Sequence, residues 1–141
     1  NFLKDELLSH FESIHQIQFL GAKTDVNSVD SLKKLCNELR MAHHNAVVAL
    51  GAIIDGKPSI AIGINDALQK SSGMDANALV KNQVATIIKG GGGGQKSLAV
   101  AGGQDADALM SALTIVPLAI IVDVTVPESS VVTSLDVSEI P

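Results

Sequence analysis

The feature of the sequence most suited to chemistry is a run of five glycines, with Lys89 before it and Lys96 after it. Ordering five glycines costs conformational entropy, so the run predicts a backbone that takes positive φ or admits another molecule closely. Successive N–H groups in such a loop can form an anion site. A flexible linker is the alternative, because linkers are often rich in glycine. The run lies between a helical pattern and a strand pattern, which favours recognition by Gly90, Gly91, Gly92, Gly93 and Gly94.

The same segment approximates a P-loop, the Gly-x4-Gly-Lys-Ser/Thr motif that binds nucleoside triphosphates. Lys96 and Ser97 fit this motif, but Gln95 stands where the second glycine belongs. A P-loop also follows a strand and opens a helix, whose positive end meets the phosphate. Here the run follows a predicted helix and precedes a predicted strand. We therefore reject triphosphate binding at this loop.

No other residues form a convincing catalytic or metal-binding set. His43 and His44 are adjacent at a predicted helix end, with no Cys, Asp or Glu at ligand spacing, and His10 and His15 are isolated. Cys36 lies in a helical apolar pattern and is expected to be a buried, unreactive thiol. We expect no catalytic residue, no metal site and no cofactor in this chain.

The charges are unevenly distributed along the chain. Between Asp75 and Asp105 the only charged residues are Lys81, Lys89 and Lys96, and after Gln104 there are six acids and no Lys or Arg. On composition alone an ordinary solvated face explains three lysines best, and a polyanion site on a locally positive surface is the alternative. The chain has three Phe and no Trp or Tyr, which argues against recognition of single strands by base stacking.

The hydrophobic patterning predicts an α+β or mixed α/β fold. Its sheet contains an antiparallel hairpin covered by helices, and the end of an amphipathic helix precedes it. The expected helices are residues 2–14, 31–41, 76–89 and 105–113, and the expected strands are residues 17–22, 46–54, 59–64 and 96–101.

We divide the chain into three parts. Residues 1–14 are the end of an amphipathic helix through which the chain could dimerise, and residues 15–113 are a globular glycine-rich domain. Residues 114–141 are an acidic, β-prone extension, because Pro117 should break a helix. We expect this extension to be dispensable for folding. No stretch is long enough for a membrane span, and the chain looks like a piece of a longer cytoplasmic protein.

Four segments together resemble the C-terminal domain of bacterial alanyl-tRNA synthetases over about residues 1–113. They are DSLKKLCNEL, VVALGAIIDGKPSIAIGI, IIKGGGGGQ and AGGQ. A similar glycine-rich domain follows the catalytic domain of DHH-type phosphoesterases. The resemblance implies a tRNA-binding module whose partners are alanine-specific tRNA and the other domains of its synthetase. The catalytic and editing sites, with their ATP, Mg and Zn, would lie in those other domains.

Carried over by position, the family's glycine motif corresponds to Lys89, residues 90–94, Gln95, Gly102 and Gly103. Lys81 and Lys96 complete the expected RNA-binding set through their charge. Two alternatives stay open: an accessory nucleic-acid or nucleotide-binding domain of a DHH-type phosphoesterase, and a structural module that forms a homodimer through its N-terminal helix. The sequence upstream of Asn1 would separate a synthetase from a phosphoesterase, because the zinc-ligand motifs of an editing domain favour the first and an Asp-His-His motif favours the second.

Overall fold

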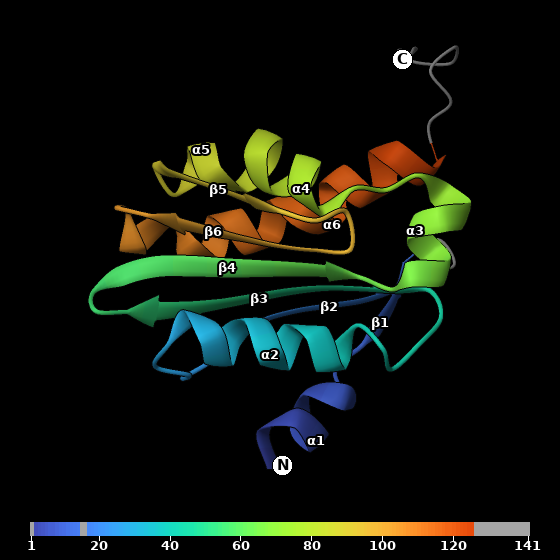
Figure 1. Cartoon of the computed structure of the whole chain (residues 1–141), viewed down its shortest axis with the longest axis horizontal. Helices are drawn as coiled ribbons and strands as arrows, with labels where there is room; N and C mark the ends of the chain where they lie inside the picture. Colours follow the sequence, from blue (N-terminus) through green and yellow to red (C-terminus); the bar gives the residue numbers. More distant parts are fainter. Residues whose placement is uncertain (1, 15–16, 126–141) are drawn as a thin grey trace, which may run out of the picture.

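The protein folds around one six-stranded sheet with helices on both faces (Figure 1). The computed structural model describes residues 2–14 and 17–125. Neighbouring strands are antiparallel, except that β2 and β3 are parallel. In spatial order the strands are β1 (Glu12–Ile14), β2 (Ile17–Lys23), β3 (Ala46–Ile54), β4 (Lys57–Ile64), β6 (Leu98–Gly103) and β5 (Gly90–Gly94).

Two apolar clusters fill the space between the sheet and its helices. One face is covered by α1 (Phe2–Leu8) and α2 (Val29–Leu39), and the other by a second group of helices (Figure 1). That group comprises α4 (Ala76–Leu79), a π-helical segment (Val80–Val84), α5 (Ala85–Ile87) and α6 (Leu109–Thr125). Two further elements lie in the connections between strands and helices: α3 (Asp66–Ser72) and a 3₁₀ turn (Ala106–Ala108). The expected mixed α/β fold is confirmed.

The predicted central hairpin is present as β3 and β4. Its turn is formed by Asp55 and Gly56, whose φ angles are 53° and 78°. Two successive positive φ values define a type I′ turn, whose twist matches that of the strands it joins. Nearly all of both strands is buried, so their apolar residues contact helices on both faces.

Helix α2 (Val29–Leu39) corresponds to the helix expected over residues 31–41. Ser28 caps its first turn by accepting a hydrogen bond from the Ser31 N–H at 3.1 Å. Cys36 lies on the buried side, and its thiol donates to the Val48 carbonyl at 3.9 Å. Burial raises the pKa of the Cys36 thiol from 9.0 to about 12, against an opposing effect of the Arg40 charge. The expected buried thiol is confirmed.

This pKa predicts a loss of stability in alkali. Between pH 9 and 12 the unfolded chain releases the Cys36 proton while the folded chain keeps it, so the free energy of unfolding falls as pH rises. The loss should approach roughly 1 kcal/mol per pH unit. Urea unfolding between pH 9 and 12 should show that the free energy of unfolding depends less on pH for Cys36→Ala than for the unaltered chain. Equal slopes would contradict a protonated buried thiol.

The expectation of one helix over residues 2–14 is wrong. Helix α1 ends at Leu8, and Glu12–Ile14 pair with β2 as a short antiparallel strand. Ser9 closes the helix, since its hydroxyl donates to the Glu6 carbonyl at 2.6 Å. Edge pairing with β2 therefore overrides the helical spacing of Phe11 and Ile14.

The expectation of strands after Thr114 is also wrong for the described part. Helix α6 continues through Pro117 to Thr125. Proline removes one helical hydrogen bond, but Val116 is fully buried in the larger apolar cluster and Ile115 packs against it. Tertiary packing of this kind outweighs local propensity. Residues 126–141, the rest of the predicted extension, lie outside the described residues.

Because Val116 is fully buried, Val116→Ala should lower the free energy of unfolding by roughly 2 kcal/mol through lost burial and a cavity. Thr114→Ala is the matched control, because Thr114 is exposed on the same helix. It should change stability by less than ~0.5 kcal/mol. Thermal or urea unfolding of both variants checks this; equal stabilities would show that α6 beyond Leu113 is not part of the core.

Candidate nucleic-acid interface

The five glycines form the outermost strand of the sheet, so the expectation of a loop is wrong. Strand β5 pairs antiparallel with β6, with Gly91 opposite Gly102 and Gly93 opposite Val100. Lys89, at φ 60°, turns the chain from α5 into the strand. At the other end the Gln95 N–H donates to the Leu98 carbonyl at 2.9 Å. Strand pairing thus gives hydrogen-bond partners to a backbone that would otherwise be costly to order.

Alternate glycines of β5 lie too close to β6 to carry a side chain. A Cβ on Gly90, Gly92 or Gly94 would collide with backbone atoms of β6, and one on Gly103 would collide with the Ile88 carbonyl. Gly91 and Gly102 differ, because a Cβ on either would have no atom within 4 Å. These two glycines are exposed and directly opposite each other, so they form a patch of bare backbone.

The helical segment beside β5 fixes the strand and contributes a cation. The Gly94 N–H donates to Asn77 Oδ1 at 3.1 Å. A Cβ on Gly93 would lie 3.3 Å from Lys81 Cε and 3.9 Å from its Nζ, so the Lys81 ammonium lies against the strand. Sequence reasoning missed Asn77, since nothing in its helical context singles out an amide that reaches across to a strand.

Three exposed lysines lie along strand β5, and we call them the lysine row. Lys89 is at the start of the strand, Lys81 is beside Gly93, and Lys96 is just after the end of the strand. The ion pair recorded among the described residues is Arg40–Asp66 at 3.0 Å, which includes none of the row. The structure therefore brings the predicted site residues together along one sheet edge. Exposed ammonium groups beside bare backbone suit a phosphate backbone.

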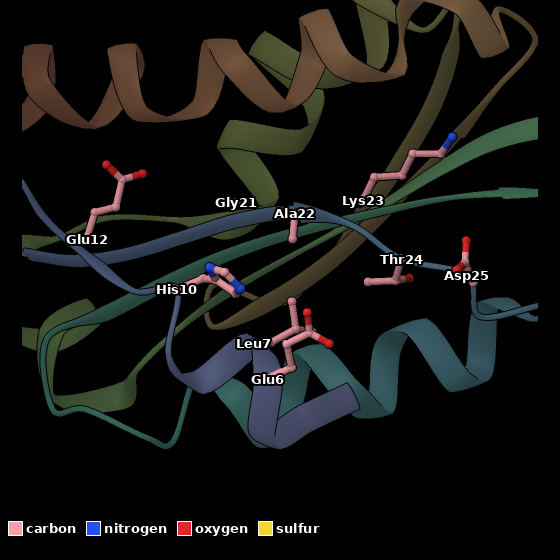
Figure 2. Close-up of a pocket in the computed structure, with 9 residues that line it drawn as sticks. All are labelled: Glu6, Leu7, His10, Glu12, Gly21, Ala22, Lys23, Thr24 and Asp25. Atoms are coloured by element: carbon pink, nitrogen blue, oxygen red, sulfur yellow. The ribbon is translucent and has the colours of Figure 1, made fainter. Parts of the chain in front are cut away.

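The opposite sheet edge carries a different surface (Figure 2). A hollow of about 690 Å³ lies between α1 and the end of β2. Its acidic lining residues are Glu6, Glu12 and Asp25, and its basic ones are Lys23 and His10. Because acids outnumber cations there, a polyanion would favour the β5 edge. Sequence analysis did not find this hollow, because its lining comes from separate segments.

Among residues 2–14 and 17–125 no cluster of three or more His, Cys, Asp or Glu could hold a metal ion. His43 packs edge-on against the Phe11 ring, with the two ring centroids 4.7 Å apart. No helix in those same ranges is long and apolar enough to traverse a bilayer.

A family model described as the DHHA1 domain matches residues 16–120. The chain belongs to the DHHA1 family. The match passes Leu113 into α6, in keeping with the burial of Val116. Similar curated proteins are the alanine–tRNA ligases of Chloroflexus aurantiacus, 37% identical over 109 residues, and Cytophaga hutchinsonii, 34% identical over 98. These matches cover 77% and 70% of this chain, which spans only 12% and 11% of those two proteins.

Solved structures share the fold of this DHHA1 domain. The C-Ala domain of Aquifex aeolicus alanyl-tRNA synthetase superposes with a TM-score of 0.68 at 22% identity, over 77% of this chain and 95% of that one. A DHH domain from the s1p family of ribosomal proteins gives 0.51 at 15% identity, over 81% of this chain and 30% of that one. The resemblance to the synthetase C-terminal domain is thus confirmed at the level of family and fold.

The glycine geometry predicts opposite effects for neighbouring positions. Gly92→Ala should lower the free energy of unfolding by roughly 1–3 kcal/mol, because its Cβ must displace the β6 backbone. Gly91→Ala should leave stability unchanged or raise it by roughly 0.5–1 kcal/mol, since the added methyl enters open space. Urea unfolding of the two variants measures both effects. If the two variants were equally stable, the close approach of β5 to β6 would be refuted.

Proposed function

We propose that this chain is the C-terminal tRNA-binding module of an alanyl-tRNA synthetase. The observation that carries the proposal is the lysine row, which lines a strand of bare backbone with exposed ammonium groups. Membership of the DHHA1 family and the similarity to alanine–tRNA ligases support tRNA as the RNA that binds. The RNA-binding set is the lysine row with Gln95, Gly102, Gly103 and the glycines of β5.

Two physical properties of this edge favour a folded RNA. The lysines neutralise phosphates without reading bases, which gives affinity that depends strongly on salt. The bare patch at Gly91 and Gly102 lets a phosphate–sugar backbone approach without a steric barrier. The chain has no Trp or Tyr for stacking on unpaired bases. Recognition by shape and charge fits the outside of a tRNA better than a single strand.

The chemistry of the parent enzyme lies elsewhere in this proposal. Since the chain spans about 12% of its curated relatives, it supplies RNA contact while other domains join alanine to tRNA and edit errors with ATP, Mg and Zn. This chain itself uses no cofactor in the proposed role. Its partners are alanine-specific tRNA and those domains, in the cytoplasm.

The accessory domain of a DHH-type phosphoesterase is the second candidate, favoured by the fold shared with a DHH domain. A substrate nucleic acid would then occupy the same edge, and the residues encoded upstream of Asn1 separate the two candidates. Dimerisation through the N-terminal helix stays a prediction. Within α1, Leu7 is buried against the chain's own α2 side.

Replacing the lysine row by Lys81→Gln, Lys89→Gln and Lys96→Gln together should weaken tRNA binding and flatten its salt dependence. The slope of log affinity against log salt should fall by roughly two to three, about one for each lost phosphate contact. Fluorescence anisotropy with labelled tRNA at several salt concentrations measures this.

The matched control removes three exposed lysines elsewhere, through Lys33→Gln, Lys34→Gln and Lys57→Gln. It changes net charge equally and should keep most of the slope. If the control lost as much slope as the lysine-row variant, overall charge rather than the β5 edge would account for binding.

A further inference from the structure

The outer side of β2 is only partly covered by its neighbour in the sheet. Strand β1 pairs with residues 17–19 of β2, whereas β2 continues to Lys23. Residues 20–23 therefore pair with β3 on one side and with no described strand on the other. The hollow beside α1 lies along this stretch, since Gly21, Ala22 and Lys23 line it.

The backbone groups that face the hollow belong to Gly21 and Lys23. The N–H groups of Gln18 and Thr24 both donate to carbonyls on the β3 side, at 2.9 and 2.7 Å. Backbone groups of successive strand residues point in alternate directions, so the N–H and C=O groups of Gly21 and Lys23 point away from β3. Within residues 2–14 and 17–125, the structure shows no hydrogen bond from these two backbones to a turn, a loop or a side chain.

These outward groups are open to a second backbone. Gly21 is exposed and has no side chain, and the Phe19 ring stands 2.9 Å from the place its Cβ would take. The Lys23 side chain is exposed and points away from α1 (Figure 2). A glycine inside a strand often marks a place where another backbone approaches closely. The edge is thus suited to pairing with an added strand.

The charge of the hollow indicates which strand would fit. Three exposed acids, Glu6, Glu12 and Asp25, stand against Lys23, which gives a formal charge of −2 with His10 neutral. A second copy of this edge would bring the same acids face to face, and like charges oppose association. A polyanion would be repelled in the same way. The complementary occupant is an extended segment that carries Lys or Arg.

We infer that a basic, extended peptide segment of a partner protein binds in this hollow as an added strand beside residues 20–23. Main-chain hydrogen bonds to Gly21 and Lys23 supply the affinity, and the acids select Lys or Arg side chains. The free edge is short and exposed ion pairs are weak, so binding is reversible and depends on salt. The inference does not rest on the proposed function, because tRNA is assigned to the opposite edge of the sheet.

The test titrates the ¹⁵N-labelled chain with a blocked hexapeptide of alternating Lys and Val. The amide signals of Gly21 and Lys23 should shift and their exchange with solvent should slow. Neutralising the acids of the hollow should weaken affinity roughly tenfold at low salt, and neutralising three exposed acids elsewhere should weaken it less than about twofold. The hollow variant is Glu6→Gln with Glu12→Gln and Asp25→Asn, and the control is Asp30→Asn with Asp55→Asn and Asp107→Asn.

A second pair of measurements separates strand addition from charge alone. Lys23→Pro removes an outward N–H without touching the β3 ladder, and it also removes a positive charge. Charge alone predicts tighter binding of the hexapeptide to this variant, whereas strand addition predicts binding roughly fivefold weaker. A hexapeptide N-methylated at two successive central residues keeps its charge and should also bind roughly fivefold more weakly to the unaltered chain, which leaves the fold unchanged.

Equal affinity for the N-methylated and unmodified peptides would overturn the inference, because it would show an acidic patch without an added strand. Unmoved signals of Gly21 and Lys23, or an equal loss of affinity in the control variant, would also overturn it. Signals that shift with protein concentration in the absence of peptide would identify a second copy as the occupant instead. If the hexapeptide binds as expected while tRNA fails to bind, strand addition stands and the proposed function falls.

Discussion

The close pairing of β5 with β6 is the constraint on which the proposed RNA-binding edge depends. Every second glycine of β5 lies where any Cβ would strike the neighbouring backbone. The strand therefore has to be glycine at those positions, and its surface is consequently backbone rather than side chain. The same pairing sets Lys89 and Lys96 at the two ends of one strand, with Lys81 beside it. A site made of bare backbone and separate cations follows from this packing requirement.

The helical segment from α4 to α5 holds strand β5 in position. Asn77 accepts the Gly94 N–H, and Asp75 caps the helix by accepting from the Ala78 N–H at 3.2 Å. On the far side of the sheet, α2 and its buried Cys36 pack against the central strands. The proposed RNA-binding edge is thus attached to a buried hairpin, which suits recognition of a large, shaped partner.

Much of this architecture could be predicted from the sequence. The hairpin of residues 46–54 and 59–64 and the placement of lysines around the glycines both follow from local chemistry. The errors arose where tertiary contacts decide. Pro117 predicts the end of a helix, but Val116 in the core carries α6 onward. The glycines predict a loop, because a strand without side chains has no alternation of apolar and polar residues. Only the pairing with the β6 backbone shows that they form a strand. Asn77 and the acidic hollow required distant segments to be placed together.

The central claim is that the β5 edge contacts tRNA. The most direct measurement is an NMR titration of the ¹⁵N-labelled chain with alanine-specific tRNA, read as amide shifts residue by residue. We expect the largest shifts on Gly91, Gly93, Lys96 and Gly102, with little change around the hollow at Glu6 and Asp25. Shifts concentrated at that hollow, or absent from the glycine strand, would contradict it.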